Sequence, residues 1–470
     1  MPFQTCAPAP ALPLEPTGPD LRALLAAAVE HVVELVDRLP TAPVLDTSGV
    51  ADLLADPAVR RQPPEHGRGV DELLAVLDHA AAKGINSASG GPLAYIPGSG
   101  LVSAAVADLL AGVLNRYTGL AAPAPGLVAM ETDVLRWLGD VFGLPATAAG
   151  TLTTGASLAT LSALVTARTA QLPPDFRTGT LYVTAQSHHC VTKSARIAGF
   201  PATAVRTVPT DASLRMDPAA LRRAIDADRA AGLRPFFVVA TAGTTNTGTI
   251  DPLPAIAEVA ASERLWLHVD AAYGGFFQLT DRGRDRLGGI ERADSLVLDP
   301  HKSLFLPFGT GCLLVRDGQL LAAAHDGGDA PYLQDLEAGT LPDFAAYGPE
   351  LTREFRGLRL WLPLHLHGVA AFRAALDEKL DLAEHAHAEL SRTPTLTVLG
   401  PPDLSTVAFR CRAGDTATTE LLSRVNAEGR VLLSSTRVDG RVLGRICVLN
   451  HRTDRARLDE ALDALRRHAA

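Results

Sequence analysis

The chain lacks the cysteine pattern of a disulfide-stapled or zinc-binding protein. Five cysteines occur among its 470 residues, and no two of them have CxxC spacing: Cys6, Cys190, Cys312, Cys411 and Cys447. An odd and dispersed set in a chain of this length argues against a disulfide framework. It indicates reduced thiols, as expected in the cytoplasm.

The chain also lacks long runs of one residue class. It has no dense Lys/Arg run, and 43 basic against 52 acidic residues give a net charge of −9, so we expect neither a nucleic-acid nor a membrane partner. No stretch of about 18 apolar residues occurs, and the Pro-rich N-terminus carries no positively charged region. We therefore expect no signal peptide and no spanning helix, and a cytoplasmic protein.

Two further absences concern ligands. Neither GxGxxG nor GxxxxGK[ST] is present, which leaves nucleotide binding with little support. The histidines of "HLH" (365–367) and "HAH" (385–387) are two residues apart on expected helices, so they do not share a face. We expect no metal site.

The composition that remains is that of an ordinary globular protein, with 47% hydrophobic and 20% charged residues. Helical periodicity dominates the first part of the chain, starting at Asp20. From about residue 150, short β-branched runs such as 180–185, 235–242, 265–272 and 295–300 alternate with amphipathic helices. This alternation predicts an α/β fold with a mainly parallel sheet covered on both faces.

The pattern also predicts the division of the chain. We expect a helical N-terminal segment over 1–90, a large domain over 91–365 and a small C-terminal domain over 366–470. The last of these begins with a long helix near 366–391 and continues with a few strands and a closing helix, which indicates an α+β domain.

Two charged residues follow neighbouring predicted strands. Asp270 ends "LWLHVD", and Lys302 comes just after "SLVLDPH". Alone, Asp270 is as readily a cap or turn residue, and Lys302 a solvated loop residue. In open α/β sheets, however, ligands bind at the carboxyl ends of the strands. A lysine and a carboxylate several ångströms apart suit a cofactor with a carbonyl at one end of a ring and a basic nitrogen at the other, and pyridoxal phosphate has this shape.

Other parts of such a site are present. In "TTGASLATLSALVTAR", Gly155, Ala156 and Ser157 begin a helix whose first N–H groups and positive dipole end suit a phosphate. In "SHHCVTK", His188 or His189 could stack on a pyridine ring, although a histidine pair is often a surface loop feature. If the strand continues past Asp270, Ala272 faces the same side, where a methyl group fits beneath an aromatic ring.

The order of "TTGAS", "SHHCVTK", "TAGTTNTGTIDP", "LHVDAAYGG" and "DPHK" resembles that of the group II pyridoxal-phosphate-dependent amino-acid decarboxylases, the family of the aromatic-L-amino-acid and glutamate decarboxylases. The resemblance extends from about residue 93 to 453. It implies the pyridoxal-phosphate-dependent transferase fold of type I and a homodimer with active sites at the interface. The implied reaction is decarboxylation of a free L-amino acid to the amine and carbon dioxide.

The resemblance also implies residue roles. Lys302 matches the lysine that carries the cofactor, Asp270 the carboxylate paired with the pyridine nitrogen, and His188 the stacking imidazole. His188 is preferred to His189 because it fits the family pattern H-x-x-V-x-K. The remaining matches are Ala272, on the opposite face of the ring, and the phosphate- or cofactor-contacting positions Ala156, Ser157, Thr245 and His301.

Substrate contacts are less defined. Tyr95 and Ile96, in "LAYIPGSG", suit an apolar or aromatic side chain better than a second carboxylate. Arg445, in "GRICVL", matches a family position near the substrate carboxylate. An arginine in a C-terminal strand is equally often part of a surface ion pair, and both readings stay open.

One position departs from the family pattern. The segment from Asp343 to Phe355 aligns without a gap on a mobile loop that carries a proton-donating tyrosine in many members, and it places Phe344 at that position. Family members with Phe there are aldehyde synthases, in which dioxygen consumes the carbanion and yields an aldehyde and hydrogen peroxide. Alternatively, Tyr347, His188 or a water donates the proton, or Phe344 merely packs.

A rival class of function remains. The same cofactor supports lysis and amino transfer, and a cofactor-bound protein without turnover is also conceivable. The complete set of Lys302, Asp270 and His188 argues against loss of turnover. Release of carbon dioxide on adding amino acids separates these cases.

Overall fold

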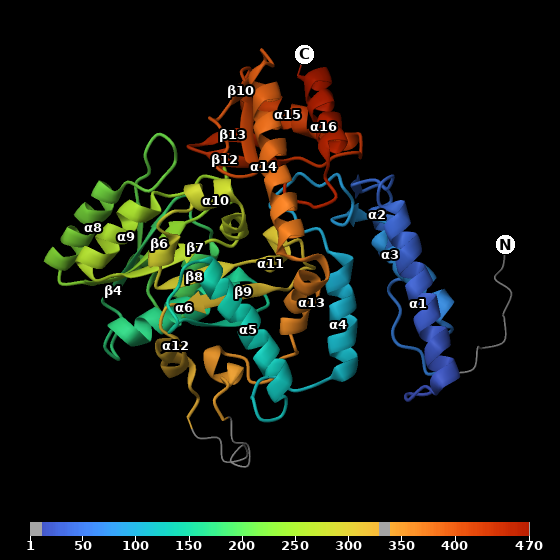
Figure 1. The fold of residues 1–470 in the computed structure, drawn as a ribbon. Helices are drawn as coiled ribbons and strands as arrows, with labels where there is room; N and C mark the ends of the chain where they lie inside the picture. The colour runs from blue at the N-terminus through green and yellow to red at the C-terminus, as the bar shows by residue number, and fades with distance from the viewer. Residues whose placement is uncertain (1–11, 329–338, 470) are drawn as a thin grey trace.

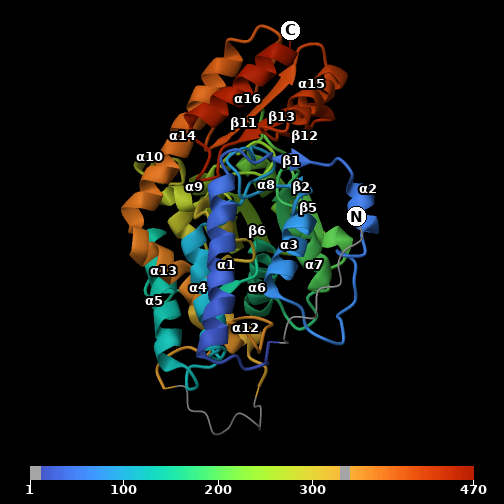
Figure 2. The same ribbon diagram turned by 90° about the vertical axis from the view of Figure 1, so that its right-hand side faces the viewer.

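The computed structural model describes residues 12–328 and 339–469. Eleven residues of the expected N-terminal arm therefore lie outside the described residues. The chain forms a central sheet with helices on both faces, a small sheet domain at the C-terminal end, and a group of N-terminal helices at one side (Figure 1). Figure 2 shows the long first helix from the front, standing against this side of the molecule.

The N-terminal part is mainly helical, as predicted. Its first three helices contain no buried residue, which sets them apart from the two helices that follow. The elements are α1 (Gly18–Arg38), β1 (Leu45–Asp46), α2 (Val50–Ala55), α3 (Val70–Ala81), β2 (Gly84–Ile85), α4 (Val102–Leu114) and α5 (Pro125–Val141). Strands β1 and β2 pair with each other in an antiparallel two-stranded sheet.

The central sheet has seven strands in the order β3-β9-β8-β7-β6-β4-β5. All neighbours from β8 to β5 are parallel, whereas β9 is antiparallel to both β3 and β8. The strands are β3 (Ala149–Thr153), β4 (Gly179–Thr184), β5 (Val205–Val208), β6 (Arg234–Thr241), β7 (Trp266–Asp270), β8 (Ser295–Leu298) and β9 (Gly311–Val315). The prediction of a mainly parallel sheet is confirmed, and β3 runs in the same direction as β8.

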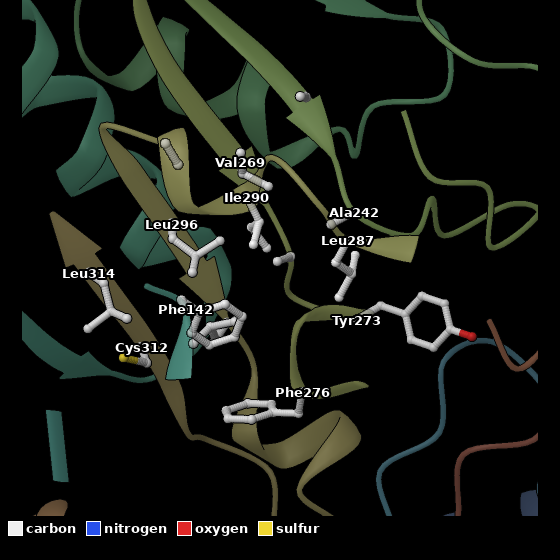
Figure 3. Packing of buried hydrophobic residues seen from close by; sticks show 14 of the residues in the cluster. Phe142, Ala242, Val269, Tyr273, Phe276, Leu287, Ile290, Leu296, Cys312 and Leu314 are labelled. Atoms are coloured by element: carbon white, nitrogen blue, oxygen red, sulfur yellow. The ribbon is translucent and has the colours of Figure 1, made fainter. Parts of the chain in front are cut away.

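The helices between these strands cover the two faces of the sheet. They are α6 (Ala156–Gln171), α7 (Cys190–Ile197), α8 (Pro218–Ala230), α9 (Leu253–Glu263), α10 (Asp281–Arg286), α11 (Pro300–Ser303) and α12 (Gly318–His325). Successive residues of a strand point to opposite faces, so Val238 packs with α8 and α9 while Val239 packs with α6 and α7. Figure 3 shows part of the first cluster, in which Leu296 lies near Phe142 and Val269 near Ile290.

The C-terminal part forms a second sheet with the order β10-β11-β13-β12, antiparallel throughout. It sits at the top of the molecule in Figure 1 together with its helices. The elements are α13 (Gly357–His367), α14 (Val369–Ser391), β10 (Leu396–Val398), β11 (Thr406–Cys411), α15 (Asp415–Ala427), β12 (Ser434–Val438), β13 (Arg441–Cys447) and α16 (Arg455–His468). Its own apolar cluster includes Leu390, Phe409 and Leu458.

Three local expectations need correction. The long helix expected near residue 366 begins at Val369, because Gly368 has a φ of 74° that ends α13. Lys302 lies in the short helix α11 instead of a loop. Strand β7 ends at Asp270, so Ala272 reaches the site from the following turn and not from strand alternation.

Two findings bear on the chain's environment. Within 12–328 and 339–469, no helix combines the length and apolar character needed to cross a membrane. Cys190, Cys312, Cys411 and Cys447 are buried and unpaired, as expected from their spacing.

A buried histidine in β7 should make stability depend on pH. Burial lowers the pKa of His268 from its ordinary 6.5 to about 3. The folded state therefore holds this imidazole neutral while the unfolded chain protonates it below its ordinary pKa, so the free energy of unfolding falls as pH decreases. Between pH 7 and 5.5 the share of this loss that comes from His268 should be about 1 kcal/mol, and His268→Asn should remove that share.

Urea unfolding at the two pH values, at one protein concentration, measures this difference. Replacing the exposed His66 by Asn is the matched control and should keep the full pH dependence. An equal pH dependence in His268→Asn and the unmodified chain would contradict the prediction.

Candidate active site

Four segments meet at one edge of the central sheet. Asp270 ends β7, Lys302 follows β8, His188 follows β4, and helix α6 begins after β3. Because these four strands run in the same direction, their carboxyl ends lie along one edge. The fold thus brings together side chains that lie up to about 150 residues apart, as expected for the crevice of an open α/β sheet.

A cavity of about 270 Å³ lies at this edge. Nine of the residues predicted for the cofactor site line it, namely Gly155, Ala156, Ser157, His188, Thr245, Asp270, Ala272, His301 and Lys302. The remaining lining residues are Thr154, Leu158, Cys190, Thr241, Gly243, Tyr273 and Asp299. The structure therefore gathers the predicted cofactor residues in one place.

Asp299 connects two sides of this cavity. Its Oδ2 lies 3.0 Å from Lys302 Nζ, in an ion pair whose carboxylate is almost completely buried. Its Oδ1 accepts a 2.7 Å hydrogen bond from the backbone N–H of Ala156, the first residue of α6. The carboxylate thereby satisfies a helix N–H that has no acceptor within the helix. Asp299 fixes the lysine relative to the helix N-terminus.

Asp270 places a second carboxylate in a nearly water-free position. Its side chain accepts one backbone hydrogen bond, from the N–H of Ala272 at 3.1 Å. Burial raises the pKa of the Asp270 carboxyl, and the positive charge of Lys302 acts in the opposite direction. A buried carboxylate with so few donors is a strong acceptor for a cationic N–H group placed in the cavity.

His188 is kept neutral at the other side. Burial lowers its pKa below the ordinary 6.5. Its Nδ1 accepts a 3.3 Å hydrogen bond from the N–H of Cys190, and its ring centre lies 4.2 Å from that of His189. A neutral imidazole held in this way offers a flat face to a ring in the cavity.

Several lining residues were not predicted from the sequence. Asp299 was the one with a usable signal, because it precedes Lys302 by three residues and so shares a face with it once the segment is helical. For Thr241 and Tyr273, no motif or spacing in the sequence indicated a place in the site. They reach the cavity only because β6 and the turn after β7 end beside it.

Phe344 and Tyr347 do not line this cavity. They bound a second cavity of about 350 Å³ between α5, β9 and the segment 340–347. Phe344 is 2% exposed, and its ring centre lies 4.7 Å from the guanidinium carbon of Arg353. Within a single chain, the predicted proton-donor position is therefore held away from Lys302.

The predicted substrate contacts also lie outside the lining. Tyr95 is 61% exposed, and Ile96 packs against the main apolar cluster. Arg445 is buried and donates four hydrogen bonds, to the carbonyl oxygens of Tyr95, Thr245 and Asn246 and to Ser434 Oγ. In the described part of the chain the Arg445 guanidinium contacts backbone rather than an acidic side chain.

The polar groups of the cavity fit pyridoxal phosphate. The hydroxyl of Thr241 is buried and has no hydrogen-bond partner among the described residues. Asp270 offers a buried acceptor for a ring N–H, and Lys302 offers an amine for an aldehyde. The N–H of Ala156 is bonded to Asp299, so the N–H groups after it in the first turn of α6 are the donors open to a phosphate. This combination defines the class of pyridoxal-phosphate-dependent enzymes.

Comparison with known proteins gives the family. Residues 64–412 match the model described as the pyridoxal-dependent decarboxylase conserved domain. The chain is 34% identical to the aromatic-L-amino-acid decarboxylase of Bacillus atrophaeus over 94% of this chain and 93% of that one. It is 30% identical to tryptophan decarboxylase 1 of Oryza sativa subsp. japonica over 91% and 90% of the two chains.

Solved structures agree with these relatives. The crystal structure of Oryza sativa TDC with PLP and tryptamine superimposes with a TM-score of 0.91 at 29% identity, covering 97% of this chain and 98% of that one. The chain belongs to the pyridoxal-dependent decarboxylase family. It is a pyridoxal-phosphate-dependent carboxy-lyase of the group II amino-acid decarboxylases.

The position of Lys302 predicts how cofactor binding depends on it. Lys302→Ala removes the only amine among the cavity-lining side chains of the described chain, so the cofactor absorbance near about 420 nm and all carbon dioxide release should disappear. Lys83→Ala, which changes an amine in the N-terminal segment, is the control and should keep both. Turnover retained by Lys302→Ala would refute the assignment.

Proposed function

We propose that the chain decarboxylates a free aromatic L-amino acid to the corresponding amine and carbon dioxide. The observation that carries this proposal is the similarity to aromatic-L-amino-acid decarboxylase over almost the whole chain, together with the complete lysine, aspartate and histidine set in one cavity. The segment with Tyr95 and Ile96 supports an aromatic or apolar substrate, because it supplies no charged side chain.

The roles that we propose follow from the geometry of the cavity. Bound pyridoxal phosphate supplies an electron-withdrawing ring that accepts the electron pair left at the substrate Cα. Lys302 would hold the cofactor through its aldehyde, and the buried Asp270 would keep a proton on its ring nitrogen. His188 covers one face of the ring and Ala272 the other.

The phosphate group needs donors of its own. We propose that Gly155, Ala156 and Ser157, at the start of α6, bind it together with Thr245 and His301. Burial lowers the pKa of His301, and its Nδ1 lies 2.7 Å from the carbonyl oxygen of Thr310. That short contact places a hydrogen on Nδ1, because a carbonyl oxygen can only accept. His301 therefore has a fixed orientation at the cavity wall.

We propose a homodimer with active sites at the interface, located in the cytoplasm. The dimer is supported by an apolar surface that is exposed to solvent in a single chain. In α1, six apolar side chains are at least 39% exposed: Leu21, Leu25, Val29, Val32, Val33 and Leu35. In α4, Val106, Leu109, Leu110, Val113 and Leu114 are at least 45% exposed. Exposed apolar surface of this extent marks an interaction site.

We also propose the division into an N-terminal segment 1–90, a large domain 91–365 and a small domain 366–470. The seven-stranded sheet spans residues 149–315 and the four-stranded sheet 396–447, so each sheet lies within one of the two domains.

A second candidate product is an aldehyde. Phe344 cannot donate a proton, and burial together with the charge of Asp343 raises the pKa of the Tyr347 hydroxyl, which makes it a weak acid. Slow protonation of Cα would leave time for reaction with dioxygen. The amino acid, dioxygen and water would then give the aldehyde, ammonia, carbon dioxide and hydrogen peroxide.

One measurement distinguishes the two products. The purified protein is incubated with a panel of L-amino acids while carbon dioxide, dioxygen and hydrogen peroxide are followed together. We expect carbon dioxide from aromatic members of the panel. Release without oxygen uptake identifies the amine, whereas carbon dioxide matched by peroxide identifies the aldehyde. No carbon dioxide from any amino acid would contradict the proposed function.

The variant Phe344→Tyr tests the loop position in the same assay. It should raise the ratio of amine to aldehyde, because it restores a proton donor. An unchanged ratio would show that residue 344 does not approach the reacting carbon. Phe355→Tyr, at a buried ring eleven residues further along the chain, is the matched control and should leave the ratio unchanged.

The apolar surface predicts the oligomeric state. Val33→Asp combined with Leu110→Asp should convert a dimer into a monomer of about 49 kDa, because each buries a carboxylate at the proposed interface. Light scattering measures the mass. Leu399→Asp, at a 43% exposed leucine of the small domain, is the control and should leave the dimer intact. Dimers that persist in the double variant would place the interface elsewhere.

A further inference from the structure

The C-terminal domain holds the segment 86–100 by hydrogen bonds to its backbone. The side chains that supply these bonds are Arg445, Asn450, Arg452 and Thr453, and they bond the carbonyl oxygens of Ser87, Ala88, Ser89, Gly90, Tyr95, Ser99 and Gly100. Backbone bonds of Leu93 to Leu432 and Cys447 add to them. A segment whose carbonyl oxygens are bonded at so many positions has little freedom to move.

Tyr95 is the strained point of this segment. Its φ is 58°, in the left-handed region that residues with a Cβ rarely occupy. Its N–H donates to Ser434 Oγ at 2.9 Å, and its carbonyl oxygen accepts from Arg445 Nη2 at 2.9 Å. Arg445 Nη1 donates to the same Ser434 Oγ at 2.9 Å. Ser434 therefore binds the N–H of Tyr95, Arg445 binds its carbonyl oxygen, and the two side chains also bond each other.

The same guanidinium reaches the wall of the cavity. Arg445 Nη2 also donates to the carbonyl oxygen of Thr245, and Nε donates to that of Asn246 at 2.8 Å. Thr245 lines the Lys302 cavity. Since one nitrogen bonds the carbonyls of both Tyr95 and Thr245, the backbone of Tyr95 lies at the edge of this cavity.

A second contact fixes the segment against the site. A Cβ added at Gly98 would come within 2.9 Å of the carbonyl oxygen of His301 and 2.8 Å of the Phe308 ring. Only glycine allows this approach. Gly98, three residues after Tyr95, thus lies directly against the helix that carries Lys302.

The Tyr95 ring is free of this framework. Its backbone is bonded at both ends, yet the residue is 61% exposed. A conformation that is unfavourable for a residue with a Cβ is held in place although the ring contributes little to the core. Strain of this kind, kept by the surrounding structure, is typical of residues that contact a ligand.

We propose that Ser434 and Arg445 are positioning residues, which hold Tyr95 in its left-handed conformation and so keep its ring at the mouth of the Lys302 cavity, where it favours an aromatic substrate side chain. This inference rests on the proposed function, in which Tyr95 contacts the substrate. It gives Arg445 a role through Tyr95 and not through a bond to the substrate carboxylate.

Ser434→Ala tests the proposal most directly, because Ser434 bonds Tyr95 and Arg445 but not Thr245. We expect KM for L-tryptophan to rise about fivefold, the effect of losing one hydrogen bond. The value of kcat, the cofactor absorbance and KM for L-leucine, where that substrate is used, should change less than about twofold. Ser434→Thr keeps the hydroxyl and should restore KM.

A double-mutant cycle shows whether the effect passes through Tyr95. Tyr95→Ala alone should raise KM for L-tryptophan, and Ser434→Ala in that background should add nothing further. Arg445→Lys should behave like Ser434→Ala if it retains the cofactor. Arg452→Lys is the matched control, because Arg452 bonds the same segment at Ala88, Ser99 and Gly100 but not at Tyr95. It should lower the melting temperature and leave KM unchanged.

The possible failures are distinguishable. If Tyr95→Ala raises KM while Ser434→Ala does not, or if the two effects add, the positioning role is overturned and the proposed substrate contact stands. If Tyr95→Ala leaves KM for L-tryptophan unchanged, Tyr95 is not part of the substrate site and both proposals for it fail.

Discussion

The site depends on one buried carboxylate that joins two segments, the short helix α11 and the start of α6. Asp299 pairs with Lys302 and accepts the first N–H of α6, so the lysine after β8 and the helix after β3 have one fixed separation. A buried charge is stable only when its partners are in place. The remainder of the cavity is built around this pair. Asp270 adds a second buried carboxylate. Burial raises its pKa, and the positive charge of Lys302 lowers it.

The small domain is joined to this site through hydrogen bonds to backbone. Arg445 of β13 bonds Thr245 at the cavity wall and Tyr95 at its edge. Asn246, next to Thr245, also bonds Gln186 and Thr436, which belong to the large and the small domain. Buried hydrogen-bonded networks of this kind fix a single arrangement of the parts they connect. The backbone at Tyr95 and at Thr245 is therefore held by the C-terminal sheet, far from Lys302 in sequence.

The cofactor side was predictable because it follows from strand order. Residues after parallel strands must meet at one edge, and the strands before Asp270 and Lys302 were visible as apolar runs. The start of α6 and the position of His188 followed from their motifs. Phe344 was different. Its alignment was clear, but its ring lies over Arg353 in a second cavity, because a local pattern cannot show which apolar surface a loop will cover.

The sequence by itself determined the fold class, the cofactor and the residues that the fold gathers in the Lys302 cavity, since each depends on a short motif and on the order of strands and helices. Tertiary structure alone decided that Asp299 bonds the helix α6, that Arg445 bonds backbone and that Tyr95 adopts a left-handed conformation. The physical reason is that these features depend on contacts between residues about 140 to 350 positions apart. Such contacts produce no periodic pattern in the sequence, because they depend on how distant elements pack and not on local conformation.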